Sequence, residues 1–185
     1  MARLTLVRHG RAASGWQDDA DPELDDVGVA QAASMAQVLA PSGPWPVVVS
    51  PMKRTRQTAA ALERQWSTEA RVEPAVGEIP TPSGLPDLAS RGPWLVRLMA
   101  GTWDTVDDPV LVDWRQGVLD ALSVMDADTV VVSHFVAINV AVGAAVGDAR
   151  LVSFRPDNCS RTVLDNHGGR LRLVELGHQA KTEVG

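Results

Sequence analysis

The sequence predicts an α/β fold of three layers, in which a mostly parallel central sheet lies between two layers of helices. Three short apolar segments, at 4–7, 47–49 and 129–132, have the length and the Val and Leu content of buried strands. Each is followed, directly or after a loop, by a segment with helical apolar periodicity. Strands that alternate with helices build parallel sheets covered on both faces. For 185 residues we expect one domain spanning 1–185.

The positions of the individual helices, strands and loops are predicted from the spacing of the apolar residues and from the polar, Gly and Pro residues that interrupt it. The polar, acidic segment 14–26 predicts a loop, and Asp26 is placed to cap the next helix. The segment 77–109 begins with a proline-rich stretch, at 77–92, that lacks a period, and it predicts an irregular excursion, while His167-Gly168-Gly169 predicts a hairpin turn. We expect helices at 27–40, 53–65, 94–100, 110–125 and 137–146, and strands at 4–7, 47–49, 71–76, 129–132, 161–165 and 170–176.

The composition narrows the partners and the location. The formal net charge of −6 disfavours general nucleic-acid binding, which needs a basic face, but it is compatible with a small phosphorylated substrate. The longest apolar run, 130–146, is broken by Ser133, His134 and Asn139 and is shorter than the roughly 18 residues of a membrane helix, so no membrane partner is expected. The one cysteine, Cys159, cannot form a disulfide within the chain, which favours a reducing, cytoplasmic location. A monomer and a dimer both stay open.

Polar side chains follow three of the predicted strands. Arg8 and His9 come after the first, Arg54 lies shortly after the second, and His134 follows the third. Because ligands of open α/β sheets bind beyond the carboxyl ends of the strands, these side chains are expected to converge. Arginines suit phosphoryl oxygens, a neutral imidazole can act as a nucleophile, and a carboxyl group such as that of Glu78 can supply a proton if its pKa is raised.

These residues lie in motifs that resemble those of the histidine phosphatase superfamily, in its phosphoglycerate mutase-like branch. The motifs are Arg8-His9-Gly10, Leu24 to Ala32, Ser50 to Ala59, Glu78-Ile79, Val131 to His134, and Asn158-Cys159-Ser160. They extend along nearly the whole chain in the order of the family. The resemblance implies a phosphoglycerate mutase-like fold and a phosphoric monoester hydrolase of the histidine acid phosphatase type.

The resemblance also implies a mechanism in two steps. His9 attacks phosphorus and becomes phosphohistidine, while Glu78 protonates the leaving oxygen and then activates the water that releases phosphate. His134 is a catalytic residue as well, and the phosphoryl oxygens are held by Arg8, Arg54, His134 and the backbone N–H of Phe135. The family needs no metal, and neither a metal nor another cofactor is expected here.

The chain departs from the family's pattern close to the site. Relatives carry a glutamate, a serine or threonine, and an asparagine after Arg-His-Gly, whereas this chain has Arg11, Ala12 and Gly15. Arg11 is a candidate phosphate ligand in their place. The general acid also has alternatives, because Glu73 and Asp87 are close to Glu78 in the sequence. These departures leave the substrate open.

Four functions are compatible with this set of residues. A phosphatase acting on a small phosphomonoester fits best, because the excursion at 77–109, expected to cover the site, is short and has two arginines, Arg91 and Arg97. Mutases carry longer insertions with more basic residues. The alternatives are a phosphoglycerate mutase, a protein phosphohistidine phosphatase, and a phosphate-binding module without turnover.

Overall fold

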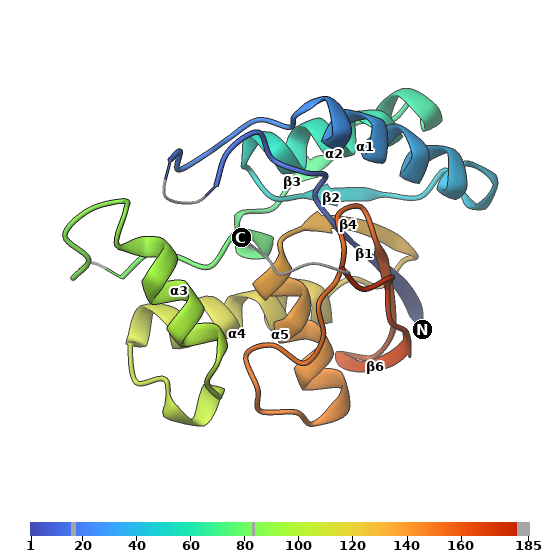
Figure 1. Cartoon of the computed structure of the whole chain (residues 1–185). Helices are drawn as coiled ribbons and strands as arrows, with labels where there is room; N and C mark the ends of the chain where they lie inside the picture. Colours follow the sequence, from blue (N-terminus) through green and yellow to red (C-terminus); the bar gives the residue numbers. More distant parts are fainter. Residues whose placement is uncertain (16–17, 83, 181–185) are drawn as a thin grey trace.

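The apolar segments form the centre of a six-stranded sheet in the computed structural model, which describes residues 1–15, 18–82 and 84–180 (Figure 1). The strands are β1 (Ala2–Arg8), β2 (Val47–Val49), β3 (Arg71–Val72), β4 (Thr129–Ser133), β5 (Arg161–His167) and β6 (Arg170–Glu175). The helices are α1 (Asp26–Leu39), α2 (Lys53–Trp66), α3 (Arg91–Met99), α4 (Pro109–Ser123) and α5 (Phe135–Val146). Short 3₁₀ turns lie at Ala40–Ser42, Pro74–Val76 and Trp103–Thr105.

The strand order is β3-β2-β4-β1-β5-β6. The pairs β2–β3, β2–β4 and β1–β4 are parallel, whereas β5 runs antiparallel to β1 and β6 antiparallel to β5. The predicted mostly parallel α/β fold is therefore confirmed, with an antiparallel hairpin at one edge. Gly168 and Gly169 turn that hairpin at φ values of 61° and 94°, which glycine adopts without a Cβ clash.

Helices cover both faces of the sheet, as Figure 1 shows, with α1 and α2 on one side and α3, α4 and α5 on the other. Alternate residues of a strand point to opposite faces. Leu6 and Val131 accordingly pack in the core that includes apolar residues of α4 and α5, while Val7 and Val132 pack in the core shared with α1 and α2. Burial on both faces explains why the central strands read as continuous apolar runs.

The expected cap of α1 is wrong by one residue. Asp25 is the cap, and its Oδ1 accepts a hydrogen bond from the Gly28 N–H at 2.7 Å. Asp26 is instead the first residue of the helix. The capping side chain has to stand just outside the helix to reach the N–H groups of the first turn, and Asp25 occupies that position.

Two further boundaries differ from expectation by three residues or more. Strand β3 ends at Val72 rather than 76, because Pro74 has no N–H for a sheet ladder and begins a 3₁₀ turn. Helix α3 begins at Arg91, inside the segment expected to be irregular. Asp87 Oδ1 accepts bonds from the N–H and the Oγ–H of Ser90, which holds the chain in a turn just before that helix.

The apolar run at 130–146 forms strand β4 and then helix α5, as predicted. Among the described residues, no helix combines the length and the apolar content needed to cross a bilayer. Trp16 and Gln17, in the loop expected at 14–26, and Ser83, in the expected excursion, lie outside the described residues.

Candidate active site

The register of two central strands brings the predicted histidines together. Arg8, the last residue of β1, is paired with Ser133, the last residue of β4. The next residues, His9 and His134, therefore lie side by side, with ring centroids 5.2 Å apart. The backbone N–H of His9 donates to Ser133 O at 3.0 Å, so the two strand ends stay joined where the polar residues begin.

His9 is a buried, neutral imidazole. Its Nδ1 lies 2.7 Å from the carbonyl oxygen of Gly10, which can only accept, so Nδ1 carries the proton. The lone pair of Nε2 accepts a hydrogen bond from Arg54 Nε at 3.2 Å. Burial, together with the charges of His134, Arg54 and Arg8, lowers the pKa of His9 well below its usual value. A neutral ring with its Nε2 lone pair in the pocket has the form that nucleophilic attack requires.

Arg54 lies at the centre of the site. It stands in the first turn of α2, with a side chain only 1% exposed. Its Nη2 donates to Glu78 Oε2 at 3.2 Å and lies 3.3 Å from His134 Nδ1. Its Nη1 is 3.8 Å from Asp21 Oδ1 but has no hydrogen-bond partner among the described residues, although it is buried.

Arg8 supplies a second buried guanidinium. Its Nη1 donates to Pro156 O at 2.9 Å, and its Cζ lies 5.3 Å from the centroid of the Phe135 ring. Its Nε is buried and, like Arg54 Nη1, without a partner in the described part of the chain. Buried polar groups normally find hydrogen-bond partners. Two unpartnered guanidinium nitrogens therefore indicate a place for an anion.

Glu78 points into the same cluster from the segment that follows the Pro74–Val76 turn. Its Oε1 accepts a bond from the Ile79 N–H at 3.0 Å, and its Oε2 lies 3.4 Å from His134 Nδ1. Burial acts to raise the pKa of Glu78, but the positive charges of His134 and Arg54 outweigh burial and hold that pKa well below its usual range. The raised pKa that was the condition for the acid role is therefore not met in the protein alone, because positively charged groups surround the carboxylate.

His134 is fully buried at the end of β4. Its Nε2 lies 2.7 Å from Ser50 Oγ, at the end of β2. Burial lowers the pKa of His134, and the neighbouring Glu78 carboxylate opposes that shift. Phe135, whose N–H was predicted as a phosphate donor, is the first residue of α5. N–H groups of a first helical turn have no acceptor within the helix, and they bear the positive end of its dipole.

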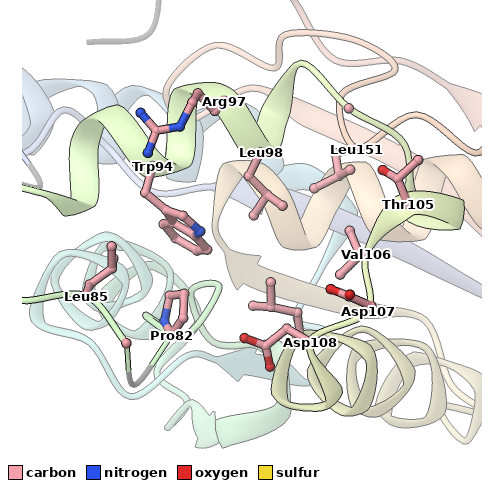
Figure 2. Close-up of a pocket in the computed structure, with 13 residues that line it drawn as sticks. Pro82, Leu85, Trp94, Arg97, Leu98, Thr105, Val106, Asp107, Asp108 and Leu151 are labelled. Carbon is pink, nitrogen blue, oxygen red and sulfur yellow. The ribbon is translucent and has the colours of Figure 1, made fainter.

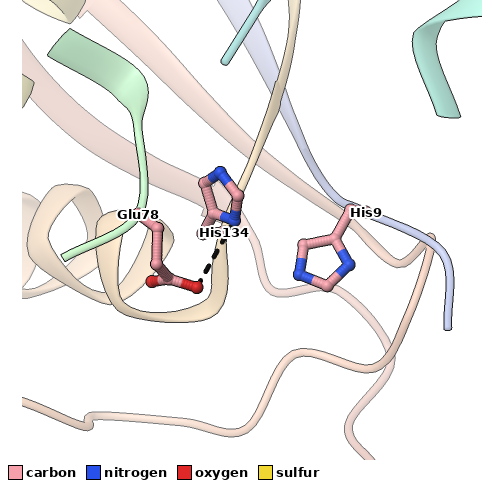
Figure 3. A group of neighbouring side chains, drawn as sticks. All are labelled: His9, Glu78 and His134. Atoms are coloured by element: carbon pink, nitrogen blue, oxygen red, sulfur yellow. Dashed lines mark ion pairs between the residues drawn. The ribbon is translucent and has the colours of Figure 1, made fainter. Parts of the chain in front are cut away.

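His9, Glu78 and His134 lie close enough to hold a metal ion by distance alone (Figure 3). Their candidate ligand atoms are all within 4.8 Å of one another. However, the guanidinium of Arg54 is within 3.3 Å of an atom of each of the three. A permanent positive charge at that position disfavours a cation and favours an anion. The donor set therefore fits a phosphate better than a metal.

The structure leaves the other predicted candidates outside this cluster. The Nε of Arg11 donates to Asp25 Oδ2 at 2.6 Å, and the Arg11 side chain is 56% exposed. Glu73 is paired with Arg71 at 2.8 Å, and Asp87 is exposed and bonded to Ser90. Of the three carboxylates considered as the acid, the structure brings Glu78 alone to the histidines.

Some supporting residues were not predicted. Ser50 contacts His134, Thr58 Oγ1 accepts from the Gly10 N–H at 3.0 Å, and Asn158 Nδ2 donates to His9 O at 2.9 Å. Ser50 and Asn158 lay within motifs already noted, so their positions were visible in the sequence. The approach of Asp21 to Arg54 had no such signal, because it depends on the path of an acidic loop.

A cavity of about 490 Å³ lies between α3, the start of α4 and the segment around Leu85 (Figure 2). Trp94 points into it, and Leu98, Val106 and Leu111 line it. Its described lining includes none of the predicted site residues. It is therefore distinct from the cluster around His9.

Fold and site together define an α/β protein with a buried cluster of arginine, histidine and glutamate side chains at the carboxyl edge of its parallel strands. Residues 4–83 match the sequence pattern of the histidine phosphatase superfamily (branch 1). Over these residues, the match confirms the resemblance to the histidine phosphatase superfamily that the motifs indicated.

Three relatives illustrate the range of the similarity. A glucosyl-3-phosphoglycerate phosphatase of Mycolicibacterium vanbaalenii is 41% identical over 64 residues, which span 32% of this chain and 28% of that protein. The solved mycobacterial glucosyl-3-phosphoglycerate phosphatase has a TM-score of 0.76 at 23% identity, over 97% of this chain and 99% of its own. A phosphatase of Escherichia coli, putatively specific for α-ribazole-5′-P, has a TM-score of 0.75 at 19% identity, over 99% and 100%. At such identities the structural likeness concerns the fold.

Proposed function

We propose that this chain is a phosphatase that hydrolyses a small phosphomonoester. The observation that carries the proposal is the neutral His9, whose Nε2 lone pair lies beside two buried guanidiniums with unpartnered nitrogens. Arginines can neutralise the non-bridging oxygens of a phosphoryl group while an uncharged imidazole attacks its phosphorus. The named relatives, which are phosphatases acting on phosphomonoesters, support this choice.

In the first step, the lone pair of His9 Nε2 forms a bond to phosphorus as the bond to the leaving oxygen breaks. The electron pair of that bond stays on the leaving oxygen, which takes a proton from Glu78. Arg8, Arg54 and His134 hold the three other oxygens. The bound phosphoryl dianion offsets the charges that lower the pKa of Glu78, so substrate binding itself favours the protonated acid that the step needs.

In the second step, Glu78 is a carboxylate and takes a proton from water. The water oxygen attacks phosphorus, the N–P bond breaks, and its electron pair returns to His9 Nε2. Inorganic phosphate then leaves, and Glu78 again holds a proton. The hydrogen bond from His9 Nδ1 to Gly10 O fixes the tautomer through both steps. The phosphohistidine and the histidine acid phosphatase type are parts of this proposal.

Rapid-quench labelling tests the nucleophile. Wild-type protein mixed with a ³²P-labelled aryl phosphate should trap an acid-labile phosphoenzyme, and His9→Ala should trap none. His167→Ala, which changes an exposed histidine at the hairpin, is the matched control and should label like the wild type. Label that persists in His9→Ala would refute the nucleophile assignment. No hydrolysis by the wild type from acidic to neutral pH would favour a binding module.

A substrate panel addresses the remaining choices. It should include glucosyl-3-phosphoglycerate, phosphoserine and 3-phosphoglycerate, which the names of structural relatives suggest, together with a phosphohistidine peptide. Net release of phosphate from a metabolite is the expected result. Interconversion of phosphoglycerate isomers without phosphate release would show a mutase, and selective dephosphorylation of the peptide would show a protein phosphatase.

The proposal extends to organisation and location. Residues 1–185 would act as one catalytic domain, with 77–109 covering the site. The contact of α3 with the segment after Glu78 supports that placement. The single cysteine supports a cytoplasmic location, and its thiol is held protonated, since burial raises the pKa of Cys159 to about 12.

A further inference from the structure

Arg91 is a buried arginine that the proposed chemistry does not use. It is the first residue of α3 and only 6% exposed. Its Nε donates to Thr81 Oγ1 at 2.7 Å, and its Nη2 donates to the carbonyl oxygen of Ile79 at 3.2 Å. Within the described ranges, no carboxylate lies within 4.0 Å of its guanidinium. Both of these acceptors are neutral.

This position is unfavourable for a cation. Burial without an ion pair removes the hydration of the guanidinium, and the positive end of the α3 dipole opposes a positive charge in the first turn. Burial accordingly lowers the pKa of Arg91, while the charge of Glu78 acts in the opposite direction. An apolar side chain of similar length would fill the same space at lower cost. The presence of an arginine here is thus better explained by the hydrogen bonds that it donates than by its packing.

Arg91 holds the residue that is bonded to the Glu78 carboxyl. Ile79 donates its N–H to Glu78 Oε1 at 3.0 Å, and its carbonyl accepts from Arg91. The Ile79 side chain is itself buried, at 1% exposure. On the other side of Glu78, the carbonyl of Val76 accepts from Ser133 Oγ at 2.7 Å. The acid is therefore fixed between a bond to β4 and a bond to α3.

We propose that Arg91 is a positioning residue for Glu78, which sets the carboxyl group against the leaving oxygen of the substrate. The inference rests on the proposed function. Through Ile79 and Thr81, Arg91 ties helix α3 to the segment directly after the acid. A displacement of about 1 Å in a reacting group can cost about 100-fold in rate. Proton transfer to the leaving oxygen is the step that such a displacement would impair.

The role predicts a dependence on the leaving group. The leaving group of an alkyl phosphate is a strongly basic alkoxide, which needs the proton from Glu78. The leaving group of p-nitrophenyl phosphate is p-nitrophenolate, which is stable as an anion. Arg91→Met should therefore lose about 100-fold in kcat on an alkyl phosphate and less than about threefold on p-nitrophenyl phosphate. Thr81→Val removes one of the two acceptors and should show a smaller loss of the same kind.

The pH profile provides a second readout. Five positive or titratable groups act on Glu78: Arg8 and His9 at the end of β1, Arg54 from α2, His134 after β4 and Arg91 from α3. Loss of the Arg91 charge should move the Glu78 limb of the profile, recognised by its absence in Glu78→Gln, to higher pH. Arg91→Lys keeps the charge but not the two-pronged hydrogen bonding, so it should leave the limb in place while lowering the rate.

Arg97→Met removes an exposed arginine from the same helix and is the matched control, expected to behave like the wild type. Equal losses on both esters with an unmoved limb would overturn the positioning role and leave Arg91 purely structural. If Arg91→Met does not fold, Arg91→Lys and Thr81→Val decide by the same ester comparison. A wild type inactive on both esters would refute the proposed function itself, which separates the two failures.

Discussion

At the scale of single residues, the site depends on which protonation state each group can adopt. His9 can be a neutral nucleophile because the Gly10 carbonyl accepts a hydrogen bond from its Nδ1–H, while burial and the neighbouring charges discourage a second proton. Glu78 is held as a carboxylate by its interactions with His134 and Arg54. Substrate binding therefore has to change only one of the two groups: the nucleophile is already neutral, whereas the acid is protonated more readily once a phosphoryl dianion is bound.

Glu78→Gln tests the acid directly. The amide keeps the shape of the side chain but cannot give up a proton at the pH of the reaction. We expect a loss of about 10²- to 10⁴-fold in kcat on alkyl phosphates and a much smaller loss on p-nitrophenyl phosphate, measured by phosphate release. Glu73→Gln, which retains an acceptor in the cap of the Pro74 turn, is the control. Comparable losses on the two esters would assign the proton to another group.

We expect the buried guanidinium of Arg54 to contribute mainly to transition-state stabilisation rather than to packing. Arg54 touches His9, Glu78 and His134, and its Nη1 is unpartnered among the described residues. Arg54→Ala is expected to remove about 3–4 kcal/mol of transition-state stabilisation, as does the loss of one oxyanion-hole donor. The measurement is kcat/KM on p-nitrophenyl phosphate. Arg56→Ala, on the exposed side of α2, should change it little, and a similar loss there would count against the assignment.

A close backbone approach explains two glycines in the motifs. A Cβ on Gly28 would clash with the carbonyl oxygen of Arg11, and one on Gly10 would lie 2.6 Å from that of Gly28. Gly28→Ala is therefore expected to lower the free energy of unfolding by about 1–3 kcal/mol in urea denaturation. Gly117→Ala, where a Cβ in α4 meets nothing within 4 Å, should raise it by about 0.5–1 kcal/mol. The opposite order would contradict this packing.

At the scale of elements, the histidines and arginines of the site lie where a strand ends or a helix begins. The parallel register of β1 and β4 places Arg8 opposite Ser133, so the two histidines emerge as neighbours. The first turn of α2 places Arg54 in contact with both histidines. In α5, Asn139 connects the helix to a later loop, since its Oδ1 accepts from the N–H groups of Ser153 and Phe154 at 2.8 and 3.2 Å.

Asn139→Ala should therefore destabilise the protein although the helix propensity of the residue improves. It leaves two loop N–H groups without their acceptor in a buried environment, at a cost of about 2–4 kcal/mol in the free energy of unfolding. Denaturant titration followed by circular dichroism measures this. Gln116→Ala, an exposed polar position in α4, should stay within about 0.5 kcal/mol. An Asn139 variant as stable as this control would refute the tether.

At the scale of the whole molecule, the burial of the histidines in the site couples folding to pH. His9 and His134 are buried with lowered pKa values, whereas an unfolded histidine has a pKa near about 6.5. As pH falls below that value, these two histidines therefore bind protons more readily in the unfolded chain than in the folded chain. Their contribution to stability is fully present above pH about 6.5 and is lost at lower pH.

The free energy of unfolding should accordingly fall from pH 7 to pH 5, by up to about 1.4 kcal/mol per pH unit for each buried histidine. His9→Gln removes one of the two groups and should make the slope shallower. The slope comes from urea titrations at four or five pH values. An unchanged slope in His9→Gln, or a rise in stability toward pH 5, would contradict the buried neutral state.

The sequence by itself determined the three-layer α/β class and the places of Arg8, His9, Arg54 and His134. Strand burial and helix periodicity depend on residues close together in the sequence, so they can be recognised locally. The carboxyl ends of parallel strands lie at the same edge of the sheet. Only the tertiary structure decided that Glu78, rather than Glu73 or Asp87, meets the histidines, that Arg11 turns away to Asp25, and that Arg91 reaches back to Ile79. Those contacts depend on loop paths across distant segments, which no local pattern encodes. The charge of the pocket, and with it the lowered pKa of Glu78, likewise exists only when the strand ends have been brought together.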